Sequence, residues 1–199
     1  MKGRHPSRIA ALCAALAVGL AVLIGSAGPA AAATYALHTS VWGAWTQYSQ
    51  QESNWCWAAA TKSMIQKKAG SSPDECTIAH NGLQQPPYAA CANSGGTAAN
   101  IENAMSASGL SYKYFGSVPS MTTIRNETVA GRGIIGSIFW ASGGGHAMPL
   151  IGSNTSNEIY VTKIDTTSVS GIWISYSSFT SGTGGWPALY TPSWAVGYN

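Results

Sequence analysis

Charged side chains are scarce in this sequence: Asp, Glu, Lys and Arg together make up only 9% of its 199 residues. The 10 basic residues form no cluster of the kind that binds nucleic acid, so we expect no nucleic-acid partner. Cysteine is also rare, and the four cysteines and four histidines form no C-x-x-C or H-x-x-x-H pair typical of a zinc site. We therefore expect no metal and no cofactor. Internal repeats and low-complexity linkers are missing as well, which favours a single domain.

Only one stretch is long and apolar, and it lies near the start of the chain, over residues 9–24. Three basic residues precede it and the tripeptide Ala31-Ala32-Ala33 follows it. This order is typical of a secretory signal peptide, which we expect to span residues 1–33 and to be cleaved before Thr34. The apolar run is short for a membrane span, and no charged stop-transfer segment follows it. We therefore expect a secreted, extracellular protein that leaves the membrane when it matures.

The expected mature chain, residues 34–199, is long enough for one domain with a sizeable core. Three of the 10 basic residues belong to the signal peptide, so the mature chain keeps 7 basic residues against 7 acidic ones and has no net charge. Its abundant Gly, Ser, Thr and Trp suit a loop-rich α+β protein, which we expect to be a monomer.

Three cysteines remain after residue 33: Cys56, Cys76 and Cys91. An odd number in a secreted protein leaves one thiol unpaired. Cys76 and Cys91 bracket a loop that contains two prolines, and a disulfide between them would stabilise the fold by on the order of 3 kcal/mol. We expect this pair to form the disulfide and Cys56 to stay free.

Cys56 lies where a Gln-containing, irregular stretch turns into an apolar, Ala-rich segment. Ser53 or Asn54 is expected to cap a helix over residues 56–68. A helix N-terminus favours an anion, so a thiolate at Cys56 would be stabilised, and the helix N-terminus together with a protonated His146 would lower the pKa of Cys56. The alternative is a buried cysteine that acts only as a small apolar residue.

The remaining patterns predict helices first and strands second. Helices are expected as a short turn after Asp74 and over residues 98–108 and 120–130. Strands are expected over residues 134–140, 146–152, 158–164, 171–176 and 188–198. The helical half carries Cys56, while His146 and Asp165 fall on the sheet half, and a cleft between the halves would bring them together.

With Gln50 six residues before Cys56-Trp57-Ala58-Ala59, the chain resembles a papain-like cysteine protease. More narrowly, it resembles the small secreted bacterial branch with the motif Gln-x(5)-Cys-Trp-Ala-Ala, which includes effector proteases of plant pathogens. Gly145-His146-Ala147 and Asp165, just past the strand 158–164, match in the same order.

The resemblance implies a papain-like α+β fold, in which an N-terminal helical half packs on a C-terminal antiparallel sheet half with the active site between them. It implies Cys56 as nucleophile, His146 as general base and Asp165 as the residue that orients the imidazole. It also implies Gln50 as the oxyanion-hole donor, and a protein or peptide as substrate. Asp165 is followed by Thr166 where the family often has proline, and Gln51 is an alternative to Gln50 if the helix begins one residue off.

Two other classes of function stay open. The same residues serve other acyl transfers, as in an amidase, a transpeptidase or a peptidase that matures one dedicated peptide. A non-catalytic binding module with a papain-like fold is the other alternative. Trp55 and Trp57 are expected to pack rather than contact substrate, and His38 and His80 are expected on the surface.

Overall fold

The computed structural model describes residues 45–86, 88–184 and 190–199. The expected signal peptide, its cleavage point and His38 lie outside these residues. Within the described part of the chain, no helix has both the length and the apolar character needed to cross a membrane.

Three helices lie in the N-terminal half: α2 (Cys56–Ala69), α3 (Glu75–Leu83) and α4 (Ala98–Ala107). Local caps fix two of their starts. The Asp74 side chain accepts a hydrogen bond from the backbone N–H of Thr77, and Thr97 and Asn100 form a reciprocal capping box. The expected helices 56–68 and 98–108 are thus observed, and the expected turn after Asp74 is a full nine-residue helix.

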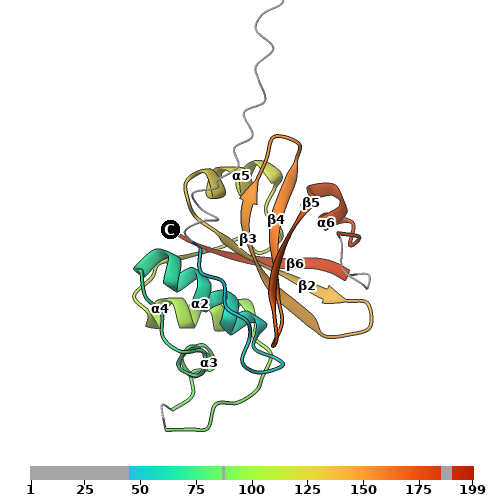
Figure 1. Ribbon diagram of the computed structural model, residues 1–199. Helices are drawn as coiled ribbons and strands as arrows, with labels where there is room; N and C mark the ends of the chain where they lie inside the picture. The colour runs from blue at the N-terminus through green and yellow to red at the C-terminus, as the bar shows by residue number, and fades with distance from the viewer. Residues whose placement is uncertain (1–44, 87, 185–189) are drawn as a thin grey trace, which may run out of the picture. The chain divides into compact units, whose positions relative to one another are not determined.

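The C-terminal half builds one antiparallel sheet with the strand order β1-β6-β2-β3-β4-β5. Its strands are listed here in chain order: β1 (Tyr112–Tyr114), β2 (Ile134–Trp140), β3 (Gly145–Ser153), β4 (Glu158–Ile164), β5 (Val169–Ser175) and β6 (Tyr190–Tyr198). Two helices accompany the sheet, α5 (Met121–Val129) and the short α6 (Tyr176–Thr180). The expected α+β class is therefore confirmed, with helices in the N-terminal half and an antiparallel sheet in the C-terminal half (Figure 1).

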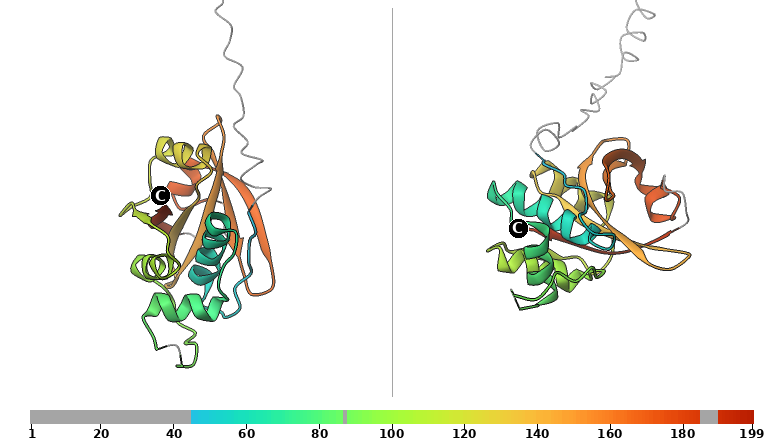
Figure 2. Two further views of the ribbon diagram at one scale, coloured as in Figure 1. Left: turned by 90° about the vertical axis from the view of Figure 1, so that its left-hand side faces the viewer. Right: turned by 60° about the horizontal axis from the view of Figure 1, so that its bottom comes forward.

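The sheet separates two apolar cores, because alternate residues of a strand point to opposite faces. On β2, Ile135 packs with the residues of α2, α3 and α4, whereas Ile134 and Ile138 pack with Ile124 of α5 and Phe179 of α6. Helix α2 lies against the sheet beside β3, as the views in Figure 2 show. The nucleophile helix of the sequence prediction is thereby fixed next to the strand that carries His146.

Two elements were not expected from the sequence. Strand β1 consists of three exposed residues whose partner is β6, the last strand of the chain. Helix α6 is a single turn started by Ser175, whose hydroxyl accepts from the N–H of Ser178. Both are too short to produce a periodic pattern of their own.

Candidate active site

Cys56 is the first residue of α2, as expected, but the expected cap is wrong. The N-cap residue is Trp55, and no side chain caps the helix. The side chains of Ser53 and Asn54 are instead bonded to Asn93: Ser53 Oγ accepts from Asn93 Nδ2 at 3.0 Å, and Asn54 Nδ2 donates to the Asn93 carbonyl at 3.1 Å. No side chain of the preceding loop therefore caps the first turn of α2, where Cys56 lies.

Residues 91–96, here called the strap, hold the loop before Cys56 in place. The indole N–H of Trp55 donates to the Ala92 carbonyl at 2.9 Å, and that of Trp57 donates to the Ser94 carbonyl at 3.0 Å. Trp57 is 1% exposed. Its ring lies so close to Gly96 that a β-carbon at this glycine would meet ring atoms at 2.3 Å. Both tryptophans therefore pack, as expected, and they do so by joining the strap to α2.

The Cys56 sulfur lies against β3. The backbone N–H of Ala147 donates to Cys56 Sγ at 3.4 Å. Ala147 follows His146 directly, so this contact brings the thiol of the helical half next to the histidine of the sheet half. Cys56 is the free cysteine among the described residues.

A glycine turn presents His146 at the start of β3. Gly143 and Gly144 have φ angles of +93° and +78°, which favour glycine, and they let β2 turn back into β3. Across the ladder His146 is paired with Ile138, and the Trp140 ring stacks near the imidazole with a centroid separation of 6.4 Å. The imidazole is half-buried at this position.

Burial lowers the pKa of His146 from 6.5 to about 4, and the negative charge of Asp165 opposes this shift. Burial also raises the pKa of the Cys56 thiol, although backbone N–H groups of Ala147, Trp57 and Cys56 itself lower it in part. The expected lowering of the Cys56 pKa is therefore wrong for the thiol taken alone. The helix terminus does stabilise the thiolate, but removal of the sulfur from water outweighs it.

Gln50 is 6% exposed and lines the same cleft as Cys56. Its side-chain Nε2 donates to the Ser53 carbonyl at 2.8 Å, and its backbone N–H donates to the Asp165 carbonyl at 3.1 Å. Gln51 is exposed and does not line the cleft. The geometry therefore favours Gln50 over Gln51 as the side chain that reaches the reacting group.

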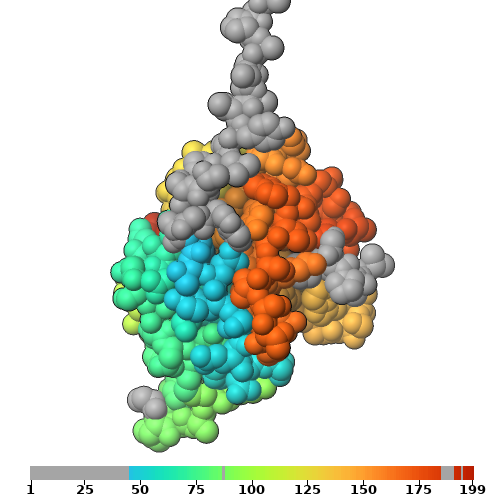
Figure 3. Space-filling model, in the orientation of Figure 1, coloured from blue at the N-terminus to red at the C-terminus, as the bar shows by residue number. Residues whose placement is uncertain are grey.

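Asp165 follows β4, as expected, and is exposed. One of its carboxylate oxygens, Oδ1, accepts the backbone N–H of Thr166 at 2.6 Å. Because its carbonyl accepts from Gln50, the segment before α2 runs alongside the end of β4, and Figure 3 shows the two lying side by side. Asp165 is close enough for its charge to act on His146.

Gln50, Cys56, His146 and Asp165 all line one cleft of about 760 Å³. Glycines of the strap line it on the helical half, and Trp140 and Ser137 of β2 line it on the sheet half. The structure thus brings together all four site residues that the sequence predicted. A thiol, an imidazole, a carboxylate and an amide in one cleft are the groups of nucleophilic acyl transfer.

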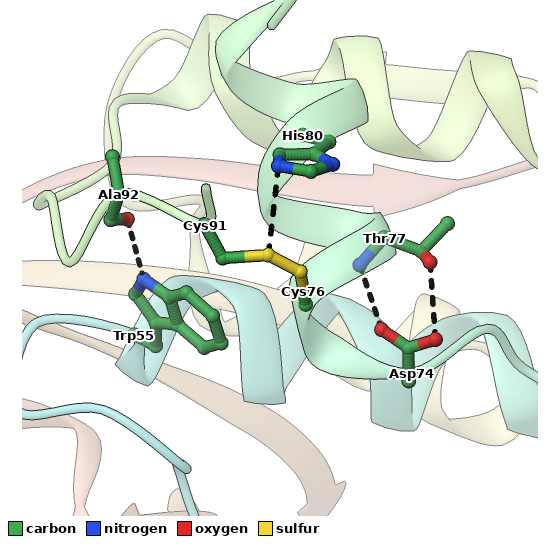
Figure 4. The surroundings of a disulfide bond; sticks show 7 residues. All are labelled: Trp55, Asp74, Cys76, Thr77, His80, Cys91 and Ala92. Atoms are coloured by element: carbon green, nitrogen blue, oxygen red, sulfur yellow. Dashed lines mark hydrogen bonds between the residues drawn. A yellow bond between two sulfur atoms is a disulfide. The ribbon is translucent and has the colours of Figure 1, made fainter. Parts of the chain in front are cut away.

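The expected cysteine pair also meets. The Cα atoms of Cys76 and Cys91 are 5.5 Å apart, the spacing typical of a disulfide, and the structure joins their side chains (Figure 4). His80 lies beside them, with Nε2 3.5 Å from Cys91 Sγ, and is buried, so its expected surface position is wrong. The signal missed in the sequence is the four-residue spacing from Cys76, which places both side chains on one face of α3.

Among the described residues, Cys76, His80 and Cys91 are the group whose ligand atoms lie close enough to hold a metal ion, all within 4.8 Å of one another. A disulfide between the two cysteines leaves neither with the thiolate that zinc requires. With that bond formed, this cluster does not fit a metal.

The sequence matches the model of a known protein family. Residues 42–180 match the model of the family described as papain-like cysteine protease AvrRpt2. The chain belongs to this family. It is therefore a papain-like cysteine peptidase, a class whose substrates are proteins or peptides. The resemblance inferred from the Gln50 and Cys56 motif is confirmed at this level.

A solved structure agrees with the family. The crystal structure of a putative C39-like peptidase from Bacillus anthracis superposes with a TM-score of 0.52 at 14% sequence identity, over 78% of this chain and 93% of that one. At this identity the similarity supports the fold alone. No curated protein sequence matches the chain.

Proposed function

We propose that this papain-like cysteine peptidase is a secreted endopeptidase that cleaves peptide bonds through a thioester intermediate. In this proposal Cys56 is the nucleophile, His146 is the general base and Asp165 orients the imidazole. The side-chain amide of Gln50 and the backbone N–H of Cys56 form the oxyanion hole. The observation that carries the proposal is the convergence of these four residues, from both halves of the fold, on one cleft.

Burial acts on both reacting groups of such a site. It disfavours a lone thiolate at Cys56 and a lone imidazolium at His146. Transfer of the thiol proton to His146 creates both charges at once, and the attraction between these opposite charges stabilises the pair. Backbone N–H groups around the sulfur and the carboxylate of Asp165 stabilise the two members of this pair.

The chemical steps then follow from these positions. The thiolate attacks the substrate carbonyl, and the oxyanion that forms is stabilised by its two donors, each contributing on the order of 3 kcal/mol in comparable sites. His146 gives its proton to the leaving amine, which departs and leaves the acyl group on the sulfur as a thioester. Water, deprotonated by His146, hydrolyses the thioester and regenerates the thiol.

The compartment belongs to the same proposal. An export signal over residues 1–33 and a mature domain over residues 34–199 would deliver the enzyme to an oxidising exterior. There the pair of Cys76 and Cys91 would be a lasting disulfide. We propose that the mature enzyme acts outside the cell as a monomer.

Active-site labelling tests the function. The purified mature protein is treated with an epoxide-type thiol inhibitor, and the modified residue is mapped by mass spectrometry, with Cys56→Ala as the matched control. We expect a single adduct at Cys56 and loss of cleavage of an unfolded protein substrate. An unlabelled Cys56, or a Cys56→Ala variant that still cleaves, would overturn the assignment.

Solvent labelling separates hydrolysis from the other acyl transfers. In H₂¹⁸O, an endopeptidase places one ¹⁸O atom in each new carboxylate as the thioester is hydrolysed. Products in which the acyl group is joined to an added amine, without ¹⁸O, would point to a transpeptidase. Absence of any turnover, with Cys56 unreactive, would point to a binding module.

A further inference from the structure

Glu75, the first residue of α3, is an acid that the proposed mechanism does not use, and it is almost completely buried, at 1% exposed. A carboxylate removed from water is unfavourable unless other groups compensate its charge. Burial raises the pKa of Glu75, while a hydrogen bond from the backbone N–H of Gln51 and the charge of Lys62 on α2 both lower it. The donor, the backbone N–H of Gln51, belongs to the segment that leads into the nucleophile helix.

The bond to Gln51 joins two segments that are far apart in the sequence. Glu75 Oε2 accepts the Gln51 N–H at 2.8 Å across 24 residues of sequence. Lys62, which provides the compensating charge, lies with its ammonium 4.3 Å from the centre of the Tyr48 ring, so it too is bound to the segment before α2. Glu75 therefore connects helix α3 to the short segment that leads into the nucleophile helix.

This segment is anchored from both halves of the fold at two consecutive residues. The N–H of Gln50 donates to the Asp165 carbonyl on the sheet half, and the N–H of Gln51 donates to the Glu75 carboxylate on the helical half. Between these anchors the Gln50 side chain enters the cleft, with Nε2 donating to the Ser53 carbonyl. Because the backbone is held at Gln50 and at Gln51, the segment cannot rotate freely, and the direction of the Gln50 side-chain amide is restricted.

We propose that Glu75 is a positioning residue for the oxyanion hole: its carboxylate holds the Gln51 amide so that the neighbouring Gln50 side chain faces the reacting carbonyl. This inference rests on the proposed role of Gln50. A charge-assisted bond is shorter and stronger than a neutral one, which suits a group that must be in place before the transition state forms.

Steady-state kinetics with one peptide substrate test it on the full mature enzyme. Glu75→Met keeps the buried volume but removes the acceptor, so the Gln51 N–H loses its partner and the melting temperature is expected to fall. Kinetics are therefore recorded well below the melting temperature of each variant. We expect the kcat of Glu75→Met to fall at least tenfold with KM within about twofold, since an oxyanion donor acts mainly in the transition state. Glu75→Gln retains an acceptor oxygen and should recover most of kcat. Glu52→Met, the same change at an exposed acid two residues from Gln50, should leave kcat unchanged.

The double variant Gln50→Ala, Glu75→Met shows whether Glu75 acts through Gln50. If it does, the double variant has the kcat of Gln50→Ala alone, because the side chain to be positioned is already gone. A kcat that falls by the product of the two single effects would overturn the proposal, as would a Glu75→Met enzyme with full kcat while Gln50→Ala is impaired. Full kcat in Gln50→Ala would overturn the proposed oxyanion donor, and this inference with it.

Discussion

Acid is expected to destabilise this protein through one half-buried histidine, His146. In the folded protein the pKa of His146 is about 4, against 6.5 for an exposed histidine, so between these pH values the unfolded chain binds a proton that the folded chain does not. Stability from this residue is therefore complete above pH 6.5 and is lost as the pH falls toward 4. The linkage relation gives a loss of about 2 kcal/mol at pH 5 and about 3 kcal/mol at pH 4.

The measurement compares His146 with a side chain that does not titrate. Urea unfolding followed by tryptophan fluorescence is recorded from pH 8 to pH 4 for the Cys56→Ser protein, which cannot digest itself, and for the same protein with His146→Gln. All other titrating groups are shared, so they cancel in the difference between the two unfolding free energies. Between pH 8 and pH 4, we expect the protein with His146 to lose about 3 kcal/mol more unfolding free energy than the protein with His146→Gln. A difference that stays constant would refute the reasoning that burial keeps this imidazole neutral.

Three further outcomes are expected. Gln50→Ala should lower kcat by roughly 10²–10³ with little change in KM, whereas Gln51→Ala should retain activity because Gln51 does not line the cleft. Steady-state kinetics on both variants check this, and an impaired Gln51→Ala beside a fully active Gln50→Ala would show that the donor is misassigned. Asp165→Asn should keep more activity than Asp165→Ala, since an amide oxygen still accepts the bond that orients an imidazole; equal kcat values for wild type and Asp165→Ala would exclude this role. Peptide mapping without reductant should find one disulfide, between Cys76 and Cys91. Replacing both cysteines by serine should lower the unfolding free energy by about 3 kcal/mol. A disulfide that includes Cys56 would contradict both the expected pairing and the free nucleophile.

Most helix positions were readable from the sequence because their starts are fixed locally. Asp74, Thr97 and Ser120 each accept a hydrogen bond from a backbone N–H three residues on, and such a contact needs nothing beyond the neighbouring turn. The start of α2 is the exception. Ser53 and Asn54 have the right chemistry for a cap, but their side chains bond Asn93, 39 or 40 residues away, and sequence spacing does not reveal this competition.

The sequence by itself determined which groups meet in the cleft, because the nucleophile motif and the histidine and acid that follow it keep their order along the chain. Only the tertiary structure decided how those groups behave. The pKa of Cys56 rises and that of His146 falls because α2 and β3 exclude water from both, and burial is a property of the packed fold. The choice of Gln50 over its neighbour and the buried contact of Glu75 depend in the same way on distant backbone positions. Local chemistry is encoded in adjacent residues, whereas solvation and orientation are set by residues that meet only after folding.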